Sequence, residues 1–69
     1  MARKIWSNPD NPPRGVAARL GITRPELSRR LHRIKRDAKL GPRERVTIWD
    51  DGSVTDEADV WIGDLYEEI

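Results

Sequence analysis

The chain contains no cysteine, no phenylalanine and a single histidine, His32. Without cysteine, neither a disulfide nor a cysteine-ligated zinc ion can brace the fold, and one histidine offers little for a structural metal site. We therefore expect no cofactor and a fold held by its apolar core. That core is thin, because a chain of 69 residues buries only about 60% of the surface that it exposes when unfolded. We expect it to include the tryptophans, Trp6, Trp49 and Trp61.

Long apolar runs are also missing. No stretch approaches the roughly 20 apolar residues of a membrane-spanning helix. The first residues, MARKIWSNPDNPP, lack the apolar centre of a secretory signal. The sequence thus predicts a soluble protein with no membrane partner, which acts in the cytoplasm, or in the cytoplasm of a target cell if it is delivered there.

Basic residues are absent from the last third of the chain. All 13 lysines and arginines lie in residues 1–45 with only four acids, a formal charge of +9, whereas residues 46–69 hold eight acids and no base. Such asymmetry indicates an anionic partner for the basic part, most often nucleic acid. Alternatively, the acidic part folds back on the basic part and neutralises it. The acidic part is also a candidate surface for a protein partner or an inhibitor.

Residues 1–69 are predicted to form a single domain that begins with an irregular arm. Residues 1–10 show no hydrophobic period, whereas residues 11–41 have the pattern of a basic helical part. In NPPRGVAARLG, asparagine and proline favour a helix start and glycine favours its end, which predicts a helix over about 12–20. We expect Asn11 to cap this helix, Gly21 to close it, and three residues to be buried: Val16, Ala17 and Leu20.

A second helix is predicted to begin at Arg24. Thr23 and Glu26 have the spacing of a capping box, in which the threonine oxygen accepts from the glutamate amide. The apolar residues that follow recur at i, i+4, i+7 and i+11, a single stripe that faces the core, namely Leu27, Leu31, Ile34 and Ala38. Gly41 and Pro42 are expected to end this helix.

Beyond Arg45 the hydrophobic period changes to two, which is typical of strands and defines an acidic β part at residues 45–69. Val46 and Ile48 share one face, and Asp51-Gly52 is a hairpin signal. Further apolar residues predict the second and third strands, namely Val54, Val60 and Ile62. These elements predict an α+β domain, in which a two-helix corner of helix-turn-helix type packs on a small antiparallel sheet of two or three strands.

The two predicted helices, joined through LGIT, resemble the helix-turn-helix of DNA-binding regulators over residues 12–34. Ala17 matches the small residue of the first helix, Gly21 matches the turn glycine, and TRPELSRRL is similar to the opening of a recognition helix. The resemblance implies a second helix in the major groove. The residues that would then contact bases or phosphates are Arg24, Ser28 and Arg29. The DNA backbone would be contacted by Arg14 and Arg33. The alternative is a helical corner that does not touch DNA.

His32 projects about 130° from the centre of the apolar stripe at 100° per residue, so it is expected on the exposed basic face. Its neighbours within one turn are Ser28, Arg29, Lys35 and Arg36. An imidazole suits a general base for an RNA 2′-hydroxyl, and arginines suit the phosphate. A second acid or base is needed, for which the candidates are Tyr66, Asp50 and Asp51. The alternative is a polar histidine on a solvated or phosphate-contacting face.

The segment LHRIKRDAKLGPRERVTIWDDGSVTD, followed by WIGDLYEEI, resembles a segment that closes many bacterial polymorphic toxins, and the resemblance covers residues 27–69. In such toxins a helix with a Leu-His-x-Ile-Lys core precedes V-x-I, DG-x-V-x-D and IG-x-L. Here Leu31, His32, Ile34 and Lys35 match the helix. The resemblance implies a nuclease that attacks RNA or DNA.

The leading hypothesis is a nucleic-acid-binding module of bacterial toxin type that acts as a metal-independent ribonuclease, with His32 as its catalytic residue. The alternative is a non-catalytic helix-turn-helix DNA-binding regulator, and a third hypothesis is a protein-interaction domain. The nucleic-acid-binding side chains predicted by the first two hypotheses are Arg14, Arg24, Ser28, Arg29, Arg33, Lys35 and Arg36.

Overall fold

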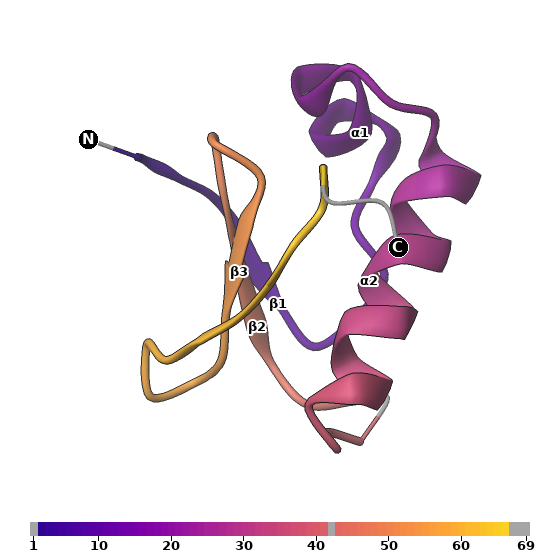
Figure 1. Ribbon diagram of the computed structural model, residues 1–69. Helices are drawn as coiled ribbons and strands as arrows, with labels where there is room; N and C mark the ends of the chain where they lie inside the picture. The colour runs from indigo at the N-terminus through magenta and orange to yellow at the C-terminus, as the bar shows by residue number, and fades with distance from the viewer. Residues whose placement is uncertain (1, 42, 67–69) are drawn as a thin grey trace.

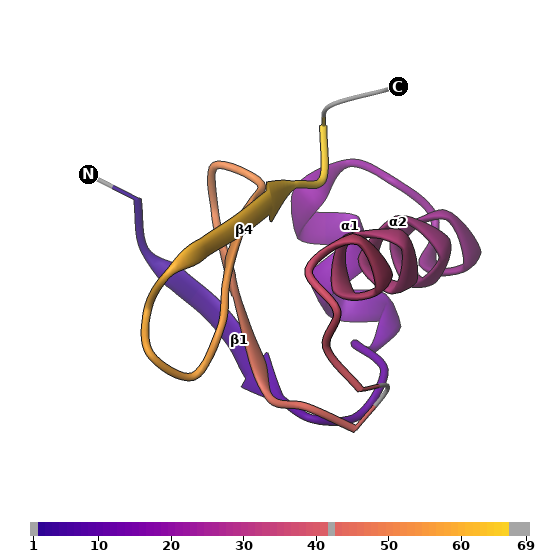
Figure 2. The same ribbon diagram turned by 60° about the horizontal axis from the view of Figure 1, so that its bottom comes forward.

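The computed structural model describes residues 2–41 and 43–66. Two helices and a four-stranded antiparallel sheet confirm the α+β class, with one strand more than the two or three predicted. In chain order the elements are β1 (Lys4–Asn8), α1 (Arg14–Leu20), α2 (Arg24–Asp37), β2 (Val46–Trp49), β3 (Ser53–Thr55) and β4 (Trp61–Asp64). Both helices lie on the same side of the sheet (Figures 1 and 2).

The additional strand, β1, lies within the segment predicted to be an irregular arm, so that prediction is wrong. β1 pairs antiparallel with β2, Ser7 opposite Thr47, and the hydroxyl groups of these two residues lie 3.2 Å apart. Ile5 and Trp6 are half-buried against the core, whereas Lys4 is exposed. β1 has no clear hydrophobic period, because it is an edge strand. It is held in the sheet by pairing with β2, 40 residues further along the chain.

The sheet has the strand order β1-β2-β3-β4, and the predicted hairpin between β2 and β3 is confirmed, with Ile48 opposite Val54. At the turn, Gly52 has a φ of 89°, which favours glycine. A Cβ atom at this position would lie 2.5 Å from the Tyr66 ring, so the tyrosine packs where only glycine leaves room. The predicted third strand is β4, which pairs with β3 across a register shift.

The first helix begins later than predicted and without the expected cap. α1 starts at Arg14, and Pro13 occupies the N-cap position with no side-chain hydrogen bond, so the prediction that Asn11 caps this helix is wrong. Its end is confirmed, because Gly21 adopts a left-handed φ of 75° and the Ile22 amide donates to the Ala17 carbonyl at 3.1 Å.

The second helix starts where predicted. Thr23 Oγ1 accepts from the Glu26 amide at 3.3 Å, which confirms this half of the capping box. α2 ends at Asp37, however, before the predicted stop at Gly41. Lys39 takes a left-handed φ of 60°, and the Leu40 amide donates to the Lys35 carbonyl at 2.8 Å, so a lysine performs the helix-closing role that a glycine usually has.

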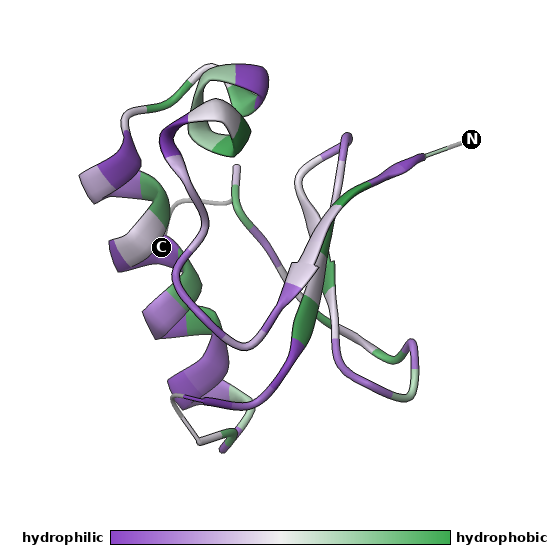
Figure 3. Ribbon diagram, turned by 180° about the vertical axis from the view of Figure 1, so that it is seen from behind, coloured by the Kyte–Doolittle hydropathy of each residue, from purple (hydrophilic) through white to green (hydrophobic). Residues whose placement is uncertain are grey.

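The core lies between the sheet and the helices. Figure 3 shows the hydrophobic face of α2 turned toward the strands and its hydrophilic face turned away. The predicted core residues of both helices are buried, except Ala38, which is half-buried. Trp6 and Trp49 are half-buried, but Trp61 is 59% exposed, so its predicted place in the core is wrong. The buried apolar residues are Val16, Ala17, Leu20, Leu27, Leu31, Ile34, Val46, Ile48, Val54 and Leu65.

Candidate nucleic-acid interface

The outer face of α2 is the most basic feature of the described structure. Leu27 and Leu31 are at most 1% exposed, so the inner face fixes the helix firmly against the core. Because α2 has a period of 3.6 residues, this burial turns the residues between the apolar positions away from the sheet. In Figures 1 and 2, none of the helices and strands formed by residues 2–41 and 43–66 lies over that outer side. A rigid helix therefore presents its polar side chains to solvent.

Six of the eight predicted site residues line one shallow concavity on this face. Its volume is about 690 Å³. No acid occurs among the described lining residues, so the predicted neutralisation of the basic part is not found at this site. The lining residues are Asn11, Arg24, Pro25, Ser28, Arg29, His32, Arg33 and Arg36. Four guanidinium groups around one concavity suit the binding of phosphate oxygens.

His32 is exposed in this concavity and is held from outside its own helix. Its Nε2 lies 3.2 Å from Asn11 Oδ1, a hydrogen bond in which the ring N–H donates. With Nε2 protonated, Nδ1 is the ring nitrogen that can accept a proton. The bond joins the segment that precedes α1 to the middle of α2. Asn11 is thus a site residue that sequence reasoning assigned to a helix cap, because asparagine before two prolines is a common capping signal.

The arginines of α2 have different roles. Arg29 pairs with Glu26 of the same helix, yet its side chain remains 70% exposed. The Arg36 side chain is 77% exposed, and its Nε lies 3.9 Å from Asp37 Oδ1. Arg30, which was not among the predicted site residues, donates to Glu26 at 2.7 Å and to the Leu65 carbonyl at 2.6 Å. Arg30 therefore fastens α2 to the segment after β4, whereas the exposed arginines are available for a ligand.

Two predicted binding residues do not line the concavity. Lys35 is only 4% exposed, so little of its side chain reaches this surface, and its binding role stays a prediction. Burial lowers the pKa of its ammonium group, while the negative charges of Glu44 and Asp10 oppose that shift. Lys35 lies beside Ile34 on the border of the apolar stripe, where its long stem packs inward. Arg14 is exposed at the start of α1 and its binding role stays a prediction.

The candidates for a second acid or base are engaged at other places in the fold. The Tyr66 hydroxyl donates to the Leu20 carbonyl at 2.8 Å, at the end of α1. Asp50 accepts from the Arg3 amide at 3.0 Å. None of the three candidates is among the described residues that line the concavity of His32. The structure therefore does not bring together, within its described part, the acid and base pair that the ribonuclease hypothesis needs.

The acidic residues of the β part shape turns. Asp51 accepts from the Ser53 amide at 2.9 Å, and this hydrogen bond lowers the pKa of its carboxyl group. Asp56 accepts from the amides of Ala58 and Val60, and Asp64 accepts from the amide of Tyr66. Within residues 2–41 and 43–66, no three potential ligand side chains gather as a metal site would require. Binding of a protein partner by this part stays a prediction.

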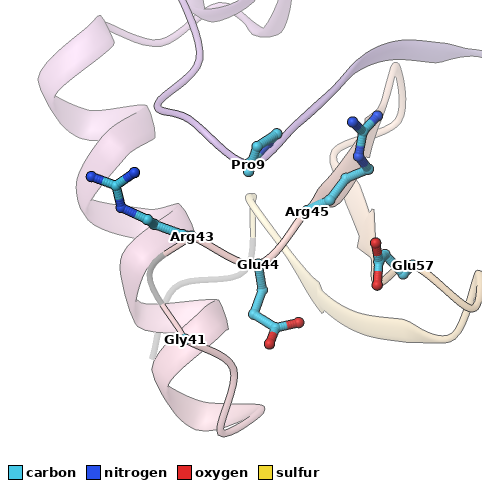
Figure 4. Close-up of a pocket in the computed structure, with 6 residues that line it drawn as sticks. All are labelled: Pro9, Gly41, Arg43, Glu44, Arg45 and Glu57. Carbon is cyan, nitrogen blue, oxygen red and sulfur yellow. The ribbon is translucent and has the colours of Figure 1, made fainter.

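A second concavity continues the basic surface along the helix. It begins at His32 and Arg36 and extends past Lys39 to Gly41. A third, in Figure 4, lies beside the segment between α2 and β2 and contains both signs of charge. In that view the side chains of Arg43, Arg45 and Glu44 point in different directions and do not converge on a common centre. Only the α2 surface therefore gathers cations around one space among the described pockets.

The chain matches no family model, and comparison with curated proteins and with solved structures gave no match either. None of the helices in the described part of the chain is long and apolar enough to cross a membrane.

Proposed function

We propose that the protein binds duplex nucleic acid through the outer face of α2, in the manner of a helix-turn-helix DNA-binding module. The observation that carries this proposal is the concavity formed by Arg24, Ser28, Arg29, His32, Arg33 and Arg36, with no acid among its described lining residues. α2 is 14 residues long, about 21 Å at 1.5 Å per residue. An exposed helix of this size fits the major groove, which is about 12 Å wide.

The order of the side chains along α2 suggests a division of labour. Arg24, Ser28 and Arg29 occupy the first half of the helix, the part that reaches base edges in helix-turn-helix proteins. Arg33 and Arg36 follow in the second half and suit phosphate contacts. Thr23 and Gly21 fix the direction in which the helix leaves α1, because one caps its start and the other closes the preceding turn.

The experiment compares two arginine variants for binding of a fluorescently labelled DNA duplex, measured by anisotropy at several salt concentrations. Arg29→Ala should weaken binding about tenfold, because it removes one of the cations that line the concavity. Arg19→Ala is the matched control, since Arg19 is an exposed arginine of α1 that does not line the concavity. Equal losses in both variants would contradict the assignment of the interface to α2.

A second candidate function is the metal-independent ribonuclease of the toxin-like hypothesis. The observation that favours it is the position of His32, fixed by Asn11 among arginines that suit phosphate. In this function His32 Nδ1 would accept the proton of a 2′-hydroxyl, and Arg29 or Arg36 would stabilise the charged phosphorane. The acid for the leaving oxygen would have to come from outside the described lining residues.

Incubation of the protein with total RNA in EDTA, followed by a denaturing gel, tests this second candidate. Discrete fragments from the wild type, and none from His32→Ala at equal RNA affinity, are expected of a catalytic His32. If the RNA stays intact in both samples, the ribonuclease is excluded and the DNA-binding module remains. If both samples cut RNA equally, His32 is not the catalytic residue.

A further inference from the structure

A groove runs between α2 and β4 and shares one lining residue, Arg33, with the basic concavity. The volume of the groove is about 190 Å³. All of its described lining residues come from these two elements, and none comes from β2 or β3, so the groove lies at the β4 edge of the sheet. From α2 it is lined by Arg30, Arg33, Ile34 and Asp37, and from β4 by Trp61, Ile62, Gly63 and Asp64.

The two edge strands of the sheet differ in how well they are protected against pairing with a further strand. β1, at one edge, has an exposed lysine at its start, polar residues at its end and a shifted register, all of which discourage a further strand. β4, at the other edge, begins with Trp61, which is 59% exposed, and follows Val60, which is 56% exposed. Exposed large apolar side chains beside an unpaired strand are typical of an interaction surface.

The charges of the groove are balanced within the groove itself. Arg33 and Asp37 are both exposed and lie four residues apart, so they point from the same side of α2. The apolar side chains that line the groove are Ile34, Trp61 and Ile62. A surface that combines two cations, two acids and apolar side chains is complementary to itself, which is the requirement of a two-fold symmetric contact.

We propose that a second copy of this chain docks in this groove, with the two β4 strands antiparallel and edge to edge. Two-fold symmetry then brings Arg33 of one copy to Asp37 of the other, and the reverse. Each Trp61 side chain is covered by the neighbouring copy, which removes it from water. The contact extends the sheet across both copies and engages Arg33, whereas the other arginines of the basic concavity, Arg24, Arg29 and Arg36, do not line the groove. This inference is independent of the proposed function.

Sedimentation equilibrium of the protein without nucleic acid tests the contact through charge reversal. The wild type should change with concentration from a species of 8.0 kDa to one of twice that mass. Arg33→Asp makes the groove acidic and Asp37→Arg makes it basic, so each variant alone should dimerise at least about tenfold more weakly, since each change acts twice in a two-fold contact. An equimolar mixture of these two variants should dimerise again, because an acidic groove meets a basic one.

Arg24→Asp is the matched control, with the same change of charge on an exposed residue of α2 outside the groove, and it should dimerise like the wild type. Trp61→Lys should weaken dimerisation without loss of helix content by circular dichroism, because Trp61 is not part of the core. A wild type that remains at 8.0 kDa up to millimolar concentration would overturn the proposal. So would a mixture of the two groove variants that stays monomeric.

Discussion

Lys35 and Arg36 are adjacent in the chain and lie in opposite environments. Arg36 is 77% exposed at the basic concavity, whereas Lys35 is 4% exposed and has a lowered pKa. A count of basic residues treats the two alike, but only one of them is placed to meet a ligand. The buried lysine instead makes the stability of the fold depend on pH, because its charged form is less well solvated in the native state than in the unfolded chain.

This dependence predicts a difference between the wild type and Lys35→Met. Between the lowered native pKa of Lys35 and the ordinary value of 10.5, the unfolded chain binds more protons than the native state. The free energy of unfolding of the wild type, relative to that of Lys35→Met, should therefore rise as the pH increases from 8 toward the ordinary pKa. Urea unfolding of both proteins at several pH values measures this difference in the free energy of unfolding. A relative stability that falls over this interval would show that the native pKa of Lys35 is raised.

The burial of Lys35 could not be predicted from the sequence of α2. Spacing on a helical wheel predicted an exposed basic face around His32 that included Lys35, and the helix-turn-helix resemblance added Arg24. The structure brings six of the predicted residues to one concavity but buries Lys35; the six are Arg24, Ser28, Arg29, His32, Arg33 and Arg36. The surroundings of Lys35 include segments outside the helix, because the negative charges of Glu44 and Asp10 act on its ammonium group. Contacts made by distant segments have no local signal in the sequence, and the bond between Asn11 and His32 was missed for the same reason.

α2 packs closely against β4 at Gly63. A Cβ atom at Gly63 would lie 2.8 Å from both Cγ1 and Cγ2 of Ile34, so glycine allows the strand to approach the helix. That approach positions the helix and thereby fixes the direction of its outer face. It also forms one wall of the groove in which we place a second copy.

Gly63→Ala should therefore reduce the free energy of unfolding by about 1–3 kcal/mol, because the new methyl group overlaps Ile34. Gly15→Ala is the matched control: it lies in α1 with no atom within 4 Å of the added methyl group, and it should stabilise the protein by about 0.5–1 kcal/mol. Urea unfolding measures both. The double variant Gly63→Ala/Ile34→Ala should lose less stability than the sum of its single changes. Additive losses would rule out the overlap as the cause.

The elements differ in how far they could be predicted. α2 has a local start signal in Thr23 and a regular apolar stripe, and its start and buried face agree with the prediction. The hairpin at Gly52 also has a local signal. β1 has none, since its order depends on pairing with β2 across the chain. The end of α2 was predicted too late. The left-handed residue that closes a helix is usually glycine, which pointed to Gly41, but here Lys39 takes that conformation.

On the scale of the whole molecule, the basic concavity of α2 and the acidic turns of the β part lie at different places in the fold. The acids of residues 46–69 that the structure describes lie in or beside the turns and strands of the sheet. The arginines of the concavity belong to α2, whose hydrophilic face is turned away from the strands in Figure 3. Such a molecule has one face that attracts polyanions and another that repels them, which orients it as it approaches a nucleic acid. Its binding should therefore weaken steeply as the salt concentration rises.

The most direct measurement is a titration of the ¹⁵N-labelled protein with a DNA duplex, followed by amide chemical shifts in near-physiological salt. We expect the largest changes between Arg24 and Arg36 and at Asn11, with small changes in β2 and β3. Shifts centred on the acidic turns, or none in α2 at millimolar duplex, would contradict the proposal that the outer face of α2 binds nucleic acid.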